Sequence, residues 1–135
     1  VLPITILLDK LKPLYPYIIP YQPQGTFFVI CNISYYCTLY ETENADHIGL
    51  KSFRQYMSLR TEEEKNVVSL DWHFCRWLCE AVGVTAIPVS AFYQRSGSTD
   101  YSDIKPSAYH LIRICYAKPD DVIAEGCDRL KLLLK

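Results

Sequence analysis

The sequence predicts an α+β fold of two layers, a two-layer sandwich in which helices cover a small three-stranded sheet. Two apolar runs, residues 26–33 and 109–117, have the composition of strands, and the first is apolar enough for burial on both faces. Two other stretches, residues 70–82 and 119–135, repeat apolar side chains at helical spacing. The predicted order is helix, strand, helix, strand, strand, helix, and a sheet of this kind needs helices as cover.

The chain begins with a predicted helix over residues 4–14. Leu7, Leu8 and Leu11 share one face of it, charged residues lie opposite, and Pro13 helps to end it. The segment is apolar but short, and it lacks the basic stretch of a signal peptide. We therefore interpret it as the cut end of a helix from a larger protein.

Residues 41–69 differ from their surroundings because they are rich in Glu, Asn, Lys and Ser. A helix is expected near residues 49–59, and residues 61–66 are expected to form a solvated loop. The charges of this stretch are interpreted as a contribution to solubility.

The second half of the chain has clearer boundaries. Ser69 is a suitable N-cap for the helix over residues 70–82, and Gly83 is a suitable stop. A short strand is expected over residues 84–87, broken by Pro88.

The last part of the chain is predicted to form a loop, a strand and a helix. A polar loop over residues 94–107 is expected to lead into the strand at 109–117. Pro119 fits the first turn of the final helix, where its missing N–H costs nothing.

Size and charge exclude several classes of function. The chain has 135 residues, the size of one domain, and half of them are hydrophobic, which is enough for a core. The net charge is −1 without a long basic run, so no nucleic-acid partner is expected. No run of 18 or more apolar residues occurs, so no membrane span is expected either.

The six cysteines could form three disulfides in a secreted protein. Several occupy positions typical of core residues, so buried free thiols in a reducing cytoplasmic or mitochondrial compartment are the preferred interpretation. Cys75 and Cys79 lie four residues apart on one helix face, but no nearby Cys or His pair completes a tetrahedral metal site. We therefore predict no metal ligand.

Arg113 is the most informative single residue, because it is the one charge in an apolar strand. Strand alternation places it on the same face as Leu111 and Cys115. A guanidinium there must meet an anion or reach water, and its planar fork suits a carboxylate. The alternatives are an internal Asp or Glu partner, or an arginine that extends to solvent at a sheet edge.

Three segments together resemble a known family. The first, residues 23–28, reads PQGTFF; the second, residues 86–93, reads AIPVSAFY; the third, residues 112–118, reads IRICYAK. In this order, with a helix between the first two, they resemble the C-terminal small domain of fold-type-I, pyridoxal-phosphate-dependent aminotransferases. The group that they resemble most comprises kynurenine aminotransferase, glutamine transaminase K and cysteine-conjugate β-lyase.

The resemblance implies a domain arrangement. Residues 1–16 would be the remnant of an interdomain helix, and residues 17–135 the small domain, with an insertion at 41–69. The family transfers an amino group from an amino acid, here of the kynurenine, glutamine or aromatic type, to a 2-oxo acid. It works as a homodimer, so the implied partners are these substrates, the chain's own large domain and a second subunit.

The resemblance also implies roles for single residues. Arg113 matches the arginine that binds the substrate α-carboxylate, Phe92 is expected to line the pocket, and Gly25 to lie near its mouth. Thr26 is bulkier than the family's usual small residue. Pyridoxal phosphate is bound by the large domain through a Schiff-base lysine. None of the eight lysines here lies in a segment that resembles that motif, so this chain is predicted to contain no catalytic or cofactor-binding residue and to be inactive alone.

Two alternatives remain open at this point. The chain could be a non-catalytic α+β module that binds an acid ligand or a protein through the Arg113 face. It could also belong to a protein that lost its catalytic lysine and kept the fold.

Overall fold

The computed structural model describes residues 3–21, 27–42, 47–92 and 110–134. The polar loop expected over residues 94–107 lies outside them. The helices are α1 (Pro3–Leu11), α2 (Ser34–Glu41), α3 (Ile48–Ser58), α4 (Glu62–Val67), α5 (Leu70–Trp77) and α6 (Asp120–Leu130). A π-helical turn, Leu78–Val82, continues α5, and 3₁₀ turns occupy Lys12–Leu14, Val89–Phe92 and Lys131–Leu134. The strands are β1 (Ile19–Pro20), β2 (Phe28–Asn32), β3 (Ile87–Pro88) and β4 (Leu111–Cys115).

The described strands form one antiparallel sheet in the order β1-β2-β4-β3. The predicted α+β class is confirmed, although the sheet has four strands where three were expected. The additional strand, β1, has only two residues, one of them Pro20, and therefore carries no periodic pattern that a sequence could reveal. The two long strands, β2 and β4, lie at the centre, with a two-residue strand at each edge.

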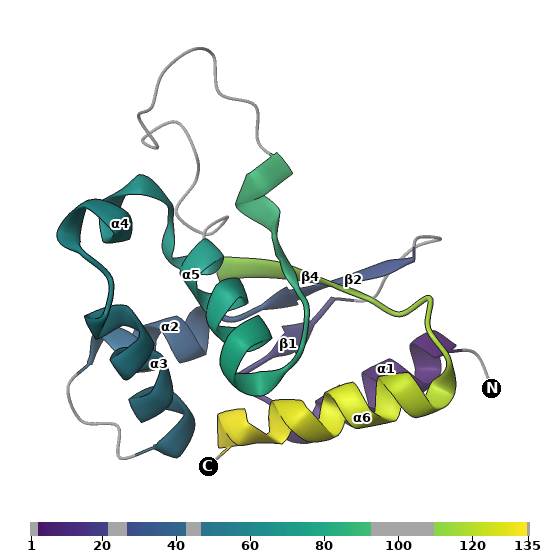
Figure 1. Ribbon diagram of the computed structural model, residues 1–135. Coiled ribbons are helices and arrows are strands. Elements are labelled where there is room, and N and C mark those ends of the chain that lie inside the picture. The colour runs from purple at the N-terminus through teal and green to yellow at the C-terminus, as the bar shows by residue number, and fades with distance from the viewer. Residues whose placement is uncertain (1–2, 22–26, 43–46, 93–109, 135) are drawn as a thin grey trace.

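One face of the sheet is the core face. Val29 and Ile112 point into the core and are fully buried, whereas Ile30 and Arg113 beside them point to the opposite face. Helices α1 and α6 lie side by side along the core face (Figure 1), and their apolar stripes meet there. Leu7, as predicted from its spacing, is part of this buried stripe.

A cluster of aromatic rings forms the second part of the core, beneath α2, α3 and α5. Tyr36, Phe53, Phe74 and Trp77 are fully buried, and the Phe53 and Trp77 ring centroids are 5.2 Å apart. The indole Nε1 of Trp77 donates to the Ser52 hydroxyl at 3.0 Å, so its one polar group is satisfied. Helix α3 falls within residues 41–69, so part of that stretch is built into the core.

The loop predicted over residues 61–66 is wrong, since α4 covers most of this segment. Thr61 is the N-cap, and its hydroxyl accepts from the Glu64 N–H at 3.1 Å. The acidic residues of the first turn complement the positive end of the helix dipole. The helix nevertheless buries no side chain, which agrees with the expected solvation of its charges.

The strand predicted over residues 84–87 is also corrected. It begins only at Ile87 and includes Pro88, which was expected to end it. Proline is tolerated because β3 is an edge strand, where one row of backbone N–H groups has no partner strand. Gly83 was predicted correctly as the helix stop, and its φ of +82° is a left-handed conformation that favours glycine. No described helix is long and apolar enough to cross a membrane.

Candidate functional site

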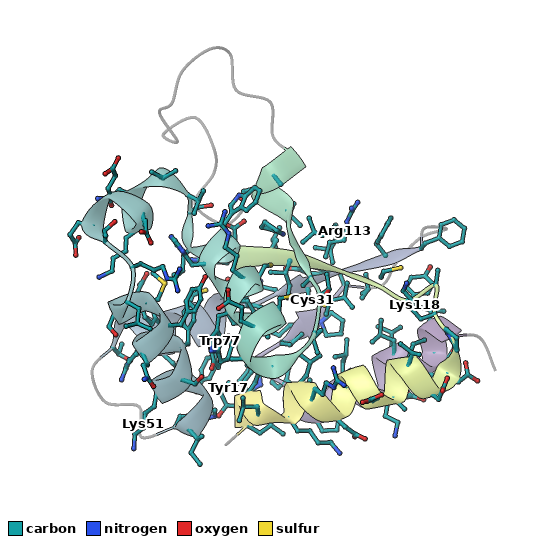
Figure 2. The ribbon with its side chains drawn as sticks, in the orientation of Figure 1. Tyr17, Cys31, Lys51, Trp77, Arg113 and Lys118 are labelled. Atoms are coloured by element: carbon teal, nitrogen blue, oxygen red, sulfur yellow. The ribbon has the colours of Figure 1, made fainter. Side chains whose placement is uncertain are left out.

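Arg113 lies in the middle of the sheet face opposite the core. It is opposite Ile30 of β2 on one side and Ile87 of β3 on the other. Both isoleucines are more than a third exposed, at 39% and 38%, whereas Arg113 is half-buried between them. The stem of the arginine is thus flanked by apolar groups, and its charged end lies at a partly open surface (Figure 2).

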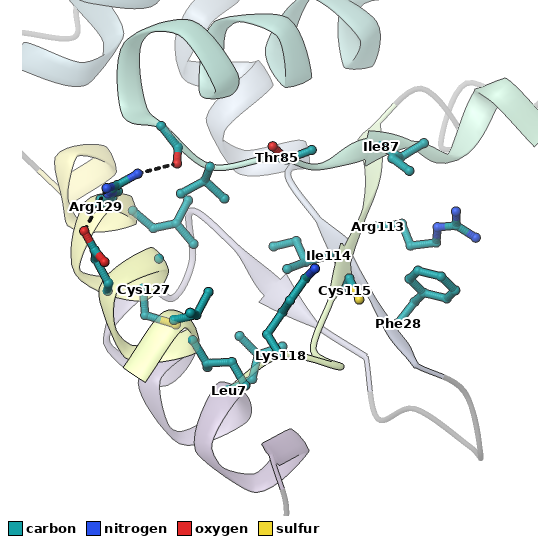
Figure 3. Close-up of a pocket in the computed structure, with 17 residues that line it drawn as sticks. Leu7, Phe28, Thr85, Ile87, Arg113, Ile114, Cys115, Lys118, Cys127 and Arg129 are labelled. Atoms are coloured by element: carbon teal, nitrogen blue, oxygen red, sulfur yellow. Dashed lines mark hydrogen bonds and ion pairs between the residues drawn. The ribbon is translucent and has the colours of Figure 1, made fainter. Parts of the chain in front are cut away.

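The guanidinium of Arg113 stacks on an aromatic ring. Its Cζ atom lies 3.9 Å from the centroid of the Phe28 ring, well within the range of a cation–π interaction. Phe28 is opposite Cys115 in the β2–β4 ladder, so it is the diagonal neighbour of Arg113 on the same face. Figure 3 shows the two side chains next to each other.

A hollow of about 500 Å³ adjoins this pair (Figure 3). Arg113 and Ile114 both line it, although consecutive strand residues face opposite sides, so the hollow lies against both faces of β4. Residues after Gly83 form one wall and α6 forms another. Its volume is in the range of small-molecule sites.

The described residues that line the hollow include three cations, Arg113, Lys118 and Arg129, and one anion, Glu125. Of its described cations, Arg129 is already bound, since it donates to the Glu125 carboxylate at 2.7 Å and to the Gly83 carbonyl at 2.9 Å. Lys118 also lines the hollow and forms no ion pair within the described residues. Arg113 and Lys118 add positive charge on opposite sides of β4 (Figure 3), which favours an acid ligand.

A buried carboxylate fixes the segment beside the site. Asp71 is fully buried in the first turn of α5, where it accepts hydrogen bonds from the hydroxyls of Ser69 and Ser90. It also accepts from the Ser90 N–H at 3.4 Å. These bonds tie the 3₁₀ turn Val89–Phe92 to α5. This network was not predicted, because Ser69 was interpreted only as the N-cap of the helix.

The three predicted site residues differ in what the structure describes of them. Arg113 is on the face and strand that alternation predicted. Phe92 ends the 3₁₀ turn after β3, and its side chain is not among the described ones. Gly25 lies outside the described residues. Phe28, which was quoted only as part of a motif, is the residue found in contact with Arg113.

Burial controls the reactivity of the thiols. All six cysteines are free, and desolvation raises the pKa of both Cys31 and Cys37 to about 12. Cys75 is buried while Cys79 is exposed, so the pair does not present two thiols to one metal ion. Over the described ranges, no group of His, Cys, Asp and Glu side chains could hold a metal.

The described lysines do not fit a pyridoxal-phosphate site. A Schiff-base lysine is activated by desolvation. Here, however, all six described lysines are exposed or only half-buried. They are Lys10, Lys12, Lys51, Lys65, Lys118 and Lys131.

Comparison with known proteins gives a consistent result at the level of the fold. No protein-family model matches the chain. A segment of 63 residues, 47% of the chain, is 35% identical to methionine aminotransferase of Escherichia coli strain K12 and spans 14% of that protein.

Solved structures extend the match over almost the whole chain. Bna3p of Saccharomyces cerevisiae, a proposed kynurenine aminotransferase, has a TM-score of 0.66 at 23% identity over 97% of this chain. N-succinyldiaminopimelate aminotransferase of Mycobacterium tuberculosis has a TM-score of 0.58 at 22% identity, also over 97%. The chain covers 25% and 23% of these two proteins, so it matches about a quarter of their length. The fold is therefore that of a part of the aminotransferase structures, and the expected aminotransferase resemblance is confirmed.

Proposed function

We propose that this chain is the part of an aminotransferase that binds the substrate carboxylate, and that Arg113 is the group that binds it. The observation that carries the proposal is the place of Arg113, a half-buried guanidinium beside a hollow of about 500 Å³ on a fold shared with aminotransferases. The kynurenine, glutamine or aromatic amino acids expected from the sequence, and a 2-oxo acid acceptor, are the proposed substrates.

The chemistry assigned to this chain is binding and orientation. A guanidinium can hold a carboxylate through two parallel N–H···O bonds, which fix its orientation as well as its position. An α-carboxylate held in this way sets the direction of the neighbouring Cα–H bond, which must be aligned before a proton can be removed. Lys118, at the side of the same hollow, adds to the attraction for an acid.

The cofactor belongs to another part of such an enzyme. Pyridoxal phosphate supplies the electron sink for aminotransferase chemistry when it is bound. Because the described lysines do not fit its site, we propose that its lysine and phosphate-binding groups lie in a large domain, and that this chain alone does not transaminate. A homodimer is proposed for the complete enzyme, and residues 1–16 as the link between its domains.

A titration of this chain tests the carboxylate site directly. We expect a 2-oxo acid such as 2-oxobutanoate to shift the NMR signals of Arg113 and its strand neighbours, and the shifts to disappear in Arg113→Ala. Arg129→Ala is a matched control, since Arg129 lines the same hollow but already pairs with Glu125. Binding that survives Arg113→Ala, or no binding to the parent chain, would overturn the proposal of a site formed by this chain.

A kinetic test applies to any longer aminotransferase that carries this chain. Arg113→Lys keeps the charge and loses the planar fork. We expect it to raise KM and to lower kcat/KM by one to two orders of magnitude, about 1.4 to 2.7 kcal/mol of transition-state binding. Unchanged kinetics would reject the role of Arg113.

A further inference from the structure

We propose that Phe28 is a positioning residue for Arg113, because its ring holds the guanidinium in the plane in which it binds a carboxylate. This inference rests on the proposed function of Arg113 and adds a second residue to it. Phe28 does not touch the substrate in this proposal, and it acts only through the arginine.

The geometry of the pair separates two kinds of contact. The Arg113 Cζ lies over the Phe28 ring at 3.9 Å from its centroid, a separation that suits a guanidinium resting with one flat face on the ring. A carboxylate binds at the edge, in the guanidinium plane, where the N–H groups point. The ring and a carboxylate therefore do not compete, and both can hold the same arginine at once.

The sheet fixes where the ring stands. Phe28 is opposite Cys115, and Ile30 is opposite Arg113, so the β2–β4 register brings the ring diagonally to the arginine. Ile87 flanks Arg113 from the other edge. With apolar groups on these sides, the directions left to the guanidinium are restricted before any ligand arrives.

This restriction is the reason for the expected effect on affinity. A free arginine side chain has many rotamers, and ordering them on binding weakens the complex. The cation–π contact removes part of this cost in advance, and its loss is expected to weaken carboxylate binding about three- to tenfold.

The test compares three variants of this chain. Phe28→Leu keeps an apolar side chain and removes the ring, whereas Phe28→Tyr retains an aromatic ring. Phe27→Leu is the matched control, because Phe27 is the adjacent residue and is 69% exposed. Each is titrated with 2-oxobutanoate, alone and in the Arg113→Lys background, after thermal melting has shown that it folds.

The NMR signal of the Arg113 Nε–H group provides a second readout that needs no ligand. A ring that covers the guanidinium shifts this signal upfield and reduces the mobility of the group. We expect the upfield shift in the parent chain and in Phe28→Tyr, and its loss in Phe28→Leu. Its absence from the parent chain would overturn the inference, even if Phe28→Leu did not fold.

The outcomes separate the inference from the proposed function. The inference is supported if binding is weakened in Phe28→Leu, retained in Phe28→Tyr and unchanged in Phe27→Leu. It also requires that Phe28→Leu cause no further loss of affinity in the Arg113→Lys background. If Arg113→Lys weakens binding and Phe28→Leu does not, the carboxylate role stands and the positioning role is refuted. If Arg113→Lys binds like the parent chain, the proposed function fails, and the inference fails with it.

Discussion

The buried carboxylate of Asp71 gives the prediction that can be worked out furthest. Replacing it by alanine removes the acceptor of three hydrogen bonds, two from Ser90 and one from Ser69. Asp71 is fully buried and Ser90 is 4% exposed, so water cannot easily take the place of the lost acceptor. The change therefore leaves buried donors without partners, which costs more than the bonds themselves contributed.

The expected loss of stability follows from these contacts. A hydrogen bond to a charged group contributes about 1.5–3 kcal/mol. The two serine hydroxyl oxygens are 3.3 Å apart, so one hydroxyl can turn to the other and recover part of the loss. Two bonds then remain broken, and Asp71→Ala is expected to lower the free energy of unfolding by about 3–6 kcal/mol. This is a large part of the 5–15 kcal/mol of an ordinary domain, about the range to expect here.

Urea denaturation of the purified chain measures this loss, read at constant slope so that only stability has changed. Asp128→Ala is the control, because Asp128 is an exposed residue of α6 that pairs with Lys131 at 3.1 Å. Such a surface pair contributes about 0–1 kcal/mol. Ser90→Ala combined with Asp71→Ala completes a cycle, in which we expect clear coupling. A loss below about 1 kcal/mol in Asp71→Ala would refute the reasoning.

Three further predictions concern pH, thiols and a turn. Burial lowers the pKa of His73 from 6.5, so the folded state resists protonation of this histidine. Thermal stability should therefore fall as the pH drops below about 6.5. A melting temperature to which His73 contributes no pH dependence between about pH 7.5 and 5 would contradict this prediction. At pH 8 the exposed Cys79 should react with a thiol reagent within minutes, while Cys31 reacts only after unfolding, as mass spectrometry of the labelled peptides would show. Gly83→Ala forces a left-handed φ on alanine and brings its Cβ to 2.8 Å from Arg129 Nη1. The variant should therefore be less stable by about 1–2 kcal/mol in urea denaturation. An unchanged denaturation midpoint would count against backbone strain at this position.

Local patterns in the sequence predicted those structural features that depend only on neighbouring residues. The stop at Gly83 and the alternation around Arg113 depend on the residue itself and its neighbours, and both agree with the structure. The helix after Thr61 was missed for a different reason. Its N-cap threonine followed by three glutamates is a local helix-start pattern, but the charges were interpreted only as a loop.

Long-range pairing explains most of what the sequence could not reveal. The first edge strand, Ile19–Pro20, forms by pairing with β2, so its own two residues do not predict it. The ring of Phe28 meets Arg113 through a register that no segment specifies alone. Helix α2, for which no prediction was made, begins beside Asn32, whose side chain accepts from the Ser34 N–H at 2.7 Å.

The pairing of β2 with β4 also has a consequence for how the chain folds. Ile30 and Arg113 are opposite each other although about 80 positions separate them. Bringing such distant residues together costs about 4 kcal/mol of loop-closure entropy, before the ladder bonds offset it. High contact order of this kind slows folding, so the helices between the two strands should acquire order first. The surroundings of Arg113 would then be completed in the last step, and its side-chain signals would report refolding later than the helical signal in circular dichroism.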